Sequence, residues 1–383
     1  MKCLLFSSVI IVMIGCSSPN KTAGNTFAND IKEIKFAGEF VIPNNEQFKN
    51  TTVGGLSAID YDAKGDVYYL ACDDPSARNP SRFYTARILL SEKGIDSIAI
   101  TGVDTLWNKE GRPFPDINQD RTHSADVEAM RYDPSRDELI WSSEGQRLIK
   151  DSIWYLQDPA IVITDRMGHY KDSFALPPNM RIQMRENGPR HNSVFEGLSF
   201  DDDFIHVYVS VEEPIYQDGP RAGAGDSTAV IRILKFNRKL KQCVAQYAYR
   251  LDAIRHAADP PGAFKINGAT DILSLGNEQF IIIERGFSTG RTSNDVRVYI
   301  ADAGDAEDIS SIPSLVTHTP VKFMPKKLLL DVNDSSKRDV FNIEGVTFGP
   351  VLPNGNRSLI FVADNNFNEK QRTQFLLFEL LSR

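Results

Sequence analysis

Short runs of apolar, β-branched and aromatic residues recur along the chain, and segments rich in Gly, Pro, Asn and Asp separate them. Five of these runs are led by a small or acidic residue, and the successive leaders are 74, 68, 75 and 73 residues apart: Gly54, Glu128, Glu196, Asp271 and Glu344. A turn follows each run, and then a second apolar run at residues 67–71, 139–142, 205–211, 280–283 and 359–363. The pattern predicts a β-hairpin repeated five times.

No segment shows sustained helical periodicity, and the strand-like runs occur in groups of about four. This pattern predicts an all-β fold, a β-propeller, rather than a barrel or a sandwich. The repeats predict five blades, and a sixth would have to come from residues 108–122 or 302–325. The last repeat ends with a third strand at 375–381, while residues 34–43 resemble the outer strand of other repeats. We therefore expect strands from both termini to close the ring over residues 31–383, which leaves no open sheet edge.

The N-terminus carries one early charge, Lys2, followed by an apolar run at residues 4–14. This run is too short to span a bilayer and is typical of a signal peptide. It ends in residues 13–16, Met-Ile-Gly-Cys, which resemble a bacterial lipobox with Met13 where Leu is usual. The resemblance implies that residues 1–15 are removed and that Cys16 is lipidated. A plain secretory signal cut nearby is the alternative.

Residues 16–30 are polar and predict a flexible tether. We expect a protein of the cell envelope that meets the membrane through its lipid anchor only. The outer membrane is favoured because Ser17 and Ser18 stand where inner-membrane lipoproteins commonly have Asp. The net charge of −8 argues against nucleic acid as a partner. A closed propeller needs no partner for stability, so a monomer is expected.

Acidic residues also end the second strand of each predicted hairpin: Asp73, Glu144, Glu212, Glu284 and Asp364. Because a hairpin is antiparallel, these ends lie beside the leaders of the first strands, and we expect both sets at one mouth of the propeller. Of the ten positions, only Gly54 is not acidic. So many converging carboxylates take up protons or bind cations.

Oxygen ligands without clustered His or Cys favour calcium or magnesium over zinc, and Asn342, Asn365 and Asn366 add neutral oxygens suited to calcium. The predicted calcium ligands are Glu128, Glu196, Glu344, Asp271, Glu144, Glu212 and Asp364. The alternative is that these acids hydrogen-bond to the backbone amides of neighbouring blades or pair with arginines.

Basic residues adjoin the acids in sequence: Arg285 follows Glu284, and Arg190 precedes Glu196. Guanidinium groups beside bound cations would hold a phosphate or carboxylate, although each Arg is equally explained by an ion pair that neutralises the ring.

The segment at residues 286–290 matches Gly-x-Ser-x-Gly, the nucleophile elbow of serine esterases. That elbow requires a helix after the turn, whereas residues 295–300 predict a strand, so Ser288 is not predicted to be a nucleophile.

Several short motifs together resemble the phytase-like family, exported bacterial proteins described as having esterase-like activity of phytase. They span nearly the whole mature chain and lie at residues 54–57, 82–84, 126–129, 143–145, 195–198, 212–214, 217–219, 284–286, 342–345 and 364–367. The resemblance implies hydrolysis of phosphate or carboxylate esters and a shape similar to that of calcium-dependent propeller phytases. Gly54 and Asp271 depart from the Glu of the other repeats, which would lower the number of metal ligands.

These observations lead to the hypothesis of a calcium-dependent hydrolase of phosphate esters that acts on a small anionic ester. Glu196, Glu344 and Glu284 would be ligands or bases. Arg285 and Arg190 would neutralise developing charge. Two alternatives stay open. One is a non-catalytic propeller that binds a sugar, peptide or protein, and the other is a lactonase-type carboxyl-ester hydrolase with one central calcium. A phosphatase needs the arginines, whereas a lactonase does not.

Overall fold

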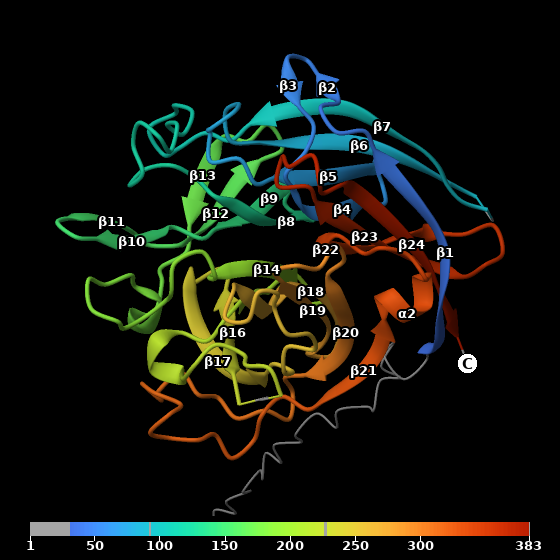
Figure 1. Ribbon diagram of the computed structural model, residues 1–383. Coiled ribbons are helices and arrows are strands. Elements are labelled where there is room, and N and C mark those ends of the chain that lie inside the picture. The colour runs from blue at the N-terminus through green and yellow to red at the C-terminus, as the bar shows by residue number, and fades with distance from the viewer. Residues whose placement is uncertain (1–30, 92, 226–227, 383) are drawn as a thin grey trace, which may run out of the picture.

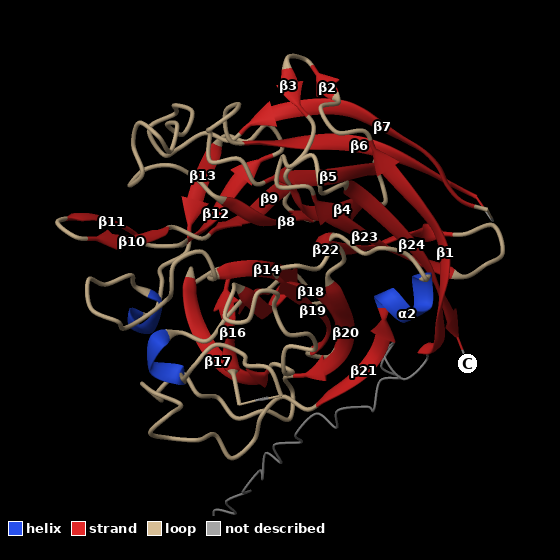
Figure 2. Cartoon of the chain, in the orientation of Figure 1, coloured by secondary structure: helices blue, strands red, loops and turns tan. Residues whose placement is uncertain are grey.

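The computed structural model describes residues 31–91, 93–225 and 228–382. Strands dominate this part of the chain, and they form five four-stranded antiparallel sheets arranged around a central axis (Figures 1 and 2). The predicted five-bladed β-propeller is thus confirmed. The signal peptide at residues 1–15, the lipidated Cys16 and the tether at 16–30 lie outside the described residues.

The blades follow one another along the chain. Blade one contains β4 (Leu56–Asp62), β5 (Val67–Cys72), β6 (Arg82–Ser91) and β7 (Gly94–Thr105). Blade two contains β8 (Val127–Asp133), β9 (Glu138–Ser143), β12 (Ala160–Asp165) and β13 (Tyr170–Ser173). Blade three contains β14 (Phe195–Phe200), β15 (His206–Val211), β16 (Val230–Asn237) and β17 (Gln242–Arg250). Blade four contains β18 (Lys265–Gly276), β19 (Gln279–Ser288), β20 (Asp295–Asp302) and β21 (Lys326–Asp331).

Blade five joins the two ends of the described chain. It contains β22 (Asn342–Val351), β23 (Arg357–Asp364), β24 (Thr373–Ser382) and, as its outer strand, β1 (Ile31–Ile42). Figure 1 shows β1 beside β24. Phe36 lies opposite Phe378 in this pairing, and Phe40 lies opposite Phe375. The ring is therefore closed by N- and C-terminal strands, as the repeat pattern predicts.

The smaller elements lie between these strands. Two short hairpins are formed by β2 (Gln47–Phe48) with β3 (Thr51–Thr52), and by β10 (Gln146–Lys150) with β11 (Ile153–Gln157). In the described residues, the helical segments are two 3₁₀ turns, Pro178–Met180 and Tyr216–Asp218, and α2 (Val332–Ser336). None of the described helices has the length and apolar character needed to cross a membrane.

The core is divided among the gaps between neighbouring blades. Each gap holds one apolar cluster to which both blades contribute, as where Trp141 of β9 shares a cluster with Tyr69 of β5. Because both faces of a blade are covered in this way, its strands read as nearly continuous apolar runs. The innermost strands β4, β8, β14, β18 and β22 contact one another in turn around the axis.

Neither candidate for a sixth blade forms a sheet. Residues 108–122 are turns and loop, and residues 303–325 form a long connection from β20 to β21. Along this connection Ile309 and Leu315 pack on Ala248, and the Met324 N–H donates to the Ala248 carbonyl at 2.9 Å. The apolar residues that suggested strands therefore cover the outer edge of blade three.

Candidate metal centre

Every innermost hairpin has a register shift at the same level, where a β-bulge interrupts the ladder. In blade three the shift falls between the pairs Phe195–Val211 and Gly197–Ser210, so Glu196 has no partner across the ladder. The side chain of a residue in a bulge does not follow the strict alternation between the two faces of the sheet, so it can point in a different direction. The bulges of the five blades, in order, contain Ser57, Glu128, Glu196, Thr270 and Glu344.

The second strand of each hairpin also contributes one residue at this level. It is the residue that follows, in sequence, the partner of the last first-strand residue before the bulge. These residues are Asp73, Glu144, Glu212, Arg285 and Asp364. The ten positions therefore hold seven carboxylates, one guanidinium and two hydroxyls. The hydroxyls bond to the neighbouring inner strand: Ser57 Oγ donates to the Val127 carbonyl at 2.9 Å, and Thr270 Oγ1 to the Ile343 carbonyl at 3.0 Å.

Two of the ring positions predicted for blade four are wrong by one residue each. Thr270 occupies the place expected for Asp271, and Arg285 occupies the place expected for Glu284. Glu284 lies away from the mouth, and its carboxylate already accepts hydrogen bonds from nearby donors. These include Lys326 Nζ at 2.5 Å and the Tyr249 hydroxyl at 2.8 Å. In blade one the bulge contains Ser57 rather than the predicted leader Gly54.

Asp271 faces the channel at a deeper level. Its two carboxylate oxygens accept hydrogen bonds from Arg131 Nη2 at 2.9 and 2.7 Å, and one of them also accepts the Val346 N–H at 2.8 Å. Both side chains are buried. The carboxylate is thus already neutralised and is not available to the cluster at the mouth.

Arg190 does not line the cavity either. Its guanidinium donates to the carbonyls of Pro214 and Gly219 at 2.7 and 2.9 Å and lies over the Tyr216 ring, where it fixes a loop. Arg221, which the sequence reasoning missed, lines the cavity and pairs with Glu213 at 3.1 Å. Its signal in the sequence was only a lone Arg in a loop.

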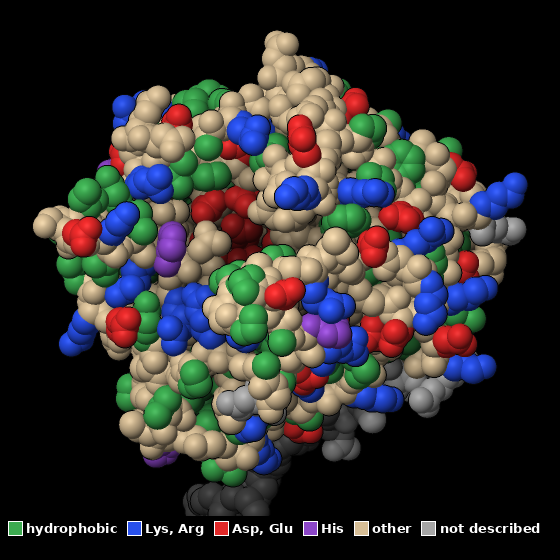
Figure 3. Space-filling view, in the orientation of Figure 1, with side chains coloured by type: hydrophobic (Ala, Val, Ile, Leu, Met, Phe, Trp, Pro, Cys, Tyr) green, Lys and Arg blue, Asp and Glu red, His purple; other side chains and the backbone are tan. Residues whose placement is uncertain are grey.

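The mouth is a cavity of about 620 Å³. Of the predicted residues, Glu128, Glu196, Glu212, Glu344 and Arg285 line it. Further lining residues include Asp73, His191, Asn342, Phe264, Ile266 and Phe287. Figure 3 shows this face, with red carboxylate groups at the bottom of a central hollow.

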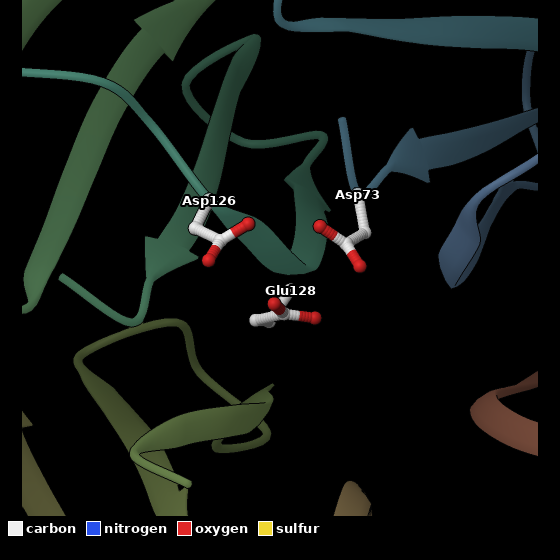
Figure 4. Close-up of side chains that lie close together, drawn as sticks. All are labelled: Asp73, Asp126 and Glu128. Carbon is white, nitrogen blue, oxygen red and sulfur yellow. The ribbon is translucent and has the colours of Figure 1, made fainter. Parts of the chain in front are cut away.

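Two groups of carboxylates converge in the hollow. One consists of Asp73, Asp126 and Glu128, and the other of Glu128, Glu144 and Glu196; within each group one oxygen per residue lies within 4.8 Å of the others. The side chains of the first group point toward a common space in Figure 4. Glu128 belongs to both groups, so it is the carboxylate that they share.

Several carboxylate oxygens of the cluster have no hydrogen-bond donor although they are buried. Glu144 Oε2, Glu344 Oε2 and Asp364 Oδ2 lack any partner, while the residues to which they belong are at most 8% exposed. A buried charged oxygen without a partner is costly. Oxygen-only donors, some of them still unpaired, fit a hard divalent cation such as calcium.

Burial and mutual repulsion raise the pKa values of these carboxyls. Burial raises the pKa of Glu144 to about 7, and burial raises that of Glu212 to about 8 although Arg285 lowers it. The pKa of Glu128 is well above its usual range because of burial and the neighbouring Asp73. Arg285 opposes this charge by donating to Glu212 at 2.9 Å and Glu344 at 3.5 Å. The cluster therefore binds protons or cations at neutral pH.

Ser288 has no nucleophilic surroundings. Its buried hydroxyl donates to the His256 backbone carbonyl at 2.7 Å, and the chain continues into strand β20 rather than a helix. The Gly-x-Ser-x-Gly match is thus part of a hairpin, as the strand pattern predicts.

The sequence model of the phytase-like family, described as "esterase-like activity of phytase", matches residues 51–367. No curated protein matches the chain in sequence. Among solved structures, an endo-arabinase from Bacteroides thetaiotaomicron is 10% identical with a TM-score of 0.45, over 88% of this chain and 96% of that one. A galactose-bound exo-β-1,3-galactanase from Phanerochaete chrysosporium is 13% identical with a TM-score of 0.46, and the match covers 89% of this chain and 64% of the galactanase chain. A periplasmic gluconolactonase from Pseudomonas aeruginosa is 10% identical with a TM-score of 0.33, and the match covers 86% of this chain and 87% of the gluconolactonase chain.

Proposed function

Because the chain belongs to the phytase-like family, we propose that it is a calcium-dependent hydrolase of phosphate esters whose reaction takes place in the acidic mouth. The observation that carries the proposal is the pair of carboxylate groups joined by Glu128. Calcium bound there would neutralise the carboxylates and polarise the phosphoryl group of the ester. The ligands would be Asp73, Asp126, Glu128, Glu144 and Glu196, with Glu344 and Asp364 supplying unpaired oxygens.

Arg285 and Glu212 then have complementary roles. The Arg285 guanidinium is 12% exposed at the cavity wall, which suits it to bind a phosphoryl oxygen and to stabilise the charge that develops in the transition state. Burial raises the pKa of Glu212 to about 8, so this carboxyl is largely protonated at neutral pH, and calcium bound nearby would favour its carboxylate form. As that carboxylate, Glu212 would take a proton from the attacking water while the water oxygen bonds to phosphorus. The ester P–O bond breaks, and the departing alcohol takes up a proton from solvent.

Arg285 favours this reading over a lactonase, because a phosphate ester is anionic before it reacts, whereas a neutral lactone does not need a guanidinium in order to bind. We further propose a monomer, anchored in the cell envelope through Cys16 and facing the periplasm or the exterior from the outer membrane. Fractionation of cells that express the Cys16→Ala variant tests the anchor: the variant should leave the membrane fraction, and retention there would contradict the proposal.

The function is tested by phosphate release from an aryl phosphate and from phytate, with calcium and with a chelator. Release that requires calcium and is lost in Glu196→Gln would support the proposal. Calcium-independent release, or none from either substrate, would overturn it and would favour a carboxyl-ester hydrolase or a binding module.

A further inference from the structure

Blade four differs from the other blades at the mouth. It provides Thr270 and Arg285 at the two ring positions, and so it contributes no carboxylate to the cluster. Its innermost hairpin also continues beyond the ring, with Ile266 opposite Phe287 and Lys265 opposite Ser288. In blades one, two and three the corresponding strand β4, β8 or β14 begins immediately beside the bulge. Blade four therefore extends further along the cavity wall than these three blades.

The extension is apolar where it faces the cavity. Phe264, Ile266 and Phe287 all line it, and the two rings lie 6.0 Å apart between centroids at 37°. Phe264 is 56% exposed, yet its backbone is fixed, because its carbonyl accepts hydrogen bonds from Thr289 N–H at 3.0 Å and Thr289 Oγ1 at 2.8 Å. Hydrophobic side chains are visible along part of the rim in Figure 3. An exposed ring held in place at the entrance of a charged cavity is a feature of a binding wall.

We propose that this apolar wall binds an aromatic ring of the substrate, and that the esters hydrolysed at the acidic mouth are aryl phosphates. The inference rests on the proposed function, which it narrows to a substrate class. A phosphate bound near Glu128 and Arg285 places its leaving group within a cavity of about 620 Å³ that has an apolar side at blade four. There an aromatic ring would stack on or pack edge-to-face against Phe264 and Phe287.

The same geometry disfavours a polyanion. On the blade-four side of the cavity, a leaving group with further phosphates would place them against Phe264, Ile266 and Phe287, whose side chains donate no hydrogen bonds. The Arg221 guanidinium, elsewhere in the lining, is already paired with Glu213. Such a leaving group would also bring its phosphates near the remaining carboxylates, which repel them. Phytate is therefore expected to be a poorer substrate than a simple aryl phosphate.

Binding of phenylphosphonate and methylphosphonate to the calcium-loaded protein, measured by calorimetry, tests the inference without requiring turnover. Both ligands carry the anionic group, and only one carries the ring. We expect phenylphosphonate to bind about tenfold more tightly, a factor that corresponds to about 1.4 kcal/mol. Phe264→Ala should remove most of this difference while leaving the affinity for methylphosphonate unchanged. Leu240→Ala, at a 59% exposed apolar residue on blade three, is the matched control and should change neither affinity.

Each outcome has a distinct meaning. Equal affinities for the two phosphonates, or a preference that survives both Phe264→Ala and Phe287→Ala, would overturn the inference and leave the proposed function standing. If neither phosphonate binds in the presence of calcium, the anion site itself is absent and both proposals fail. A lower kcat/KM of Phe264→Ala for phenyl phosphate, with that for glycerol phosphate unchanged, would support the same assignment in turnover.

Discussion

Arg131 of blade two and Asp271 of blade four meet across the central channel, where Arg131 Nη2 donates to both carboxylate oxygens at 2.9 and 2.7 Å. The two blades are not neighbours in the ring, so this buried pair joins inner strands on opposite sides of the axis. Arg131 also lines a second cavity, of about 440 Å³, together with Asp60 and Leu273. The pair thus lies between the acidic mouth and this second cavity.

Removing one partner of this pair should strongly destabilise the protein. Asp271→Asn removes the carboxylate that is hydrogen-bonded to the buried Arg131 guanidinium and leaves only the more distant Asp60 to oppose its charge. We expect a loss of about 3–5 kcal/mol in the free energy of unfolding, measured by denaturant titration. Arg87→Ala is the control, because its pair with Asp66 is more than half exposed on both sides. That variant should change the unfolding free energy by about 1 kcal/mol or less. Similar losses in the two variants would contradict the role of the central pair.

The Glu-Gly sequence at the bulge has a packing cause that can be tested. A Cβ on Gly197 would lie 2.7 Å from the Ile272 nitrogen and 2.8 Å from the Asp271 Cα, both in the neighbouring inner strand. Gly197→Ala should therefore cost about 1–3 kcal/mol of stability by overpacking. In Gly304→Ala the nearest atom belongs to the movable Asp302 side chain, so unfolding should be nearly unchanged. An equally stable Gly197→Ala protein would show that the blades can separate there at little cost.

The raised carboxyl pKa values predict how stability depends on pH in a chelator. Between the ordinary Glu value of 4.5 and the values of about 7 for Glu144 and about 8 for Glu212, the folded protein holds protons that the unfolded chain has released. Stability must then fall as pH rises through this window. We expect the melting temperature in chelator to drop by about 3 °C or more from pH 5 to pH 8.

Calcium should reverse this trend, because it binds the deprotonated carboxylates. The increase in melting temperature on adding calcium should be larger at pH 8 than at pH 5. A melting temperature in chelator that rises from pH 5 to pH 8, or an equal effect of calcium at both pH values, would contradict the electrostatic account of the cluster.

Glu128→Gln and Glu284→Gln distinguish the acidic ring seen in the structure from the ring predicted from the sequence, which included Glu284. Glu128 belongs to both carboxylate groups, whereas Glu284 pairs with Lys326 away from the mouth. Loss of the shared charge should weaken calcium binding by about tenfold or more, because one of the carboxylates that attract the cation is removed. Glu284→Gln should lower stability and leave calcium affinity unchanged. The opposite result would place the metal centre in blade four.

The sequence was sufficient for the fold because propeller repeats are periodic: even spacing of the leaders predicted five blades, and the unmatched strand at the N-terminus predicted the closure. The site was predicted only in part, because an apolar pattern does not define the register of a strand to one residue. All five hairpins have the bulge, but in blade four the acidic residues Asp271 and Glu284 each stand one position away from the ring, where Thr270 and Arg285 lie. The roles of Arg131 and Lys326 depend on long-range contacts that no local motif reveals.

Calorimetric titration of the metal-free protein with calcium at pH 7.5 would show whether the acidic mouth holds calcium and whether Glu128 is one of its ligands. We expect saturable binding of two ions with release of protons, and binding that is about tenfold or more weaker in Glu128→Gln when that variant remains folded. A folded protein that takes up no calcium, or one that binds it equally well without the Glu128 carboxylate, would contradict the account.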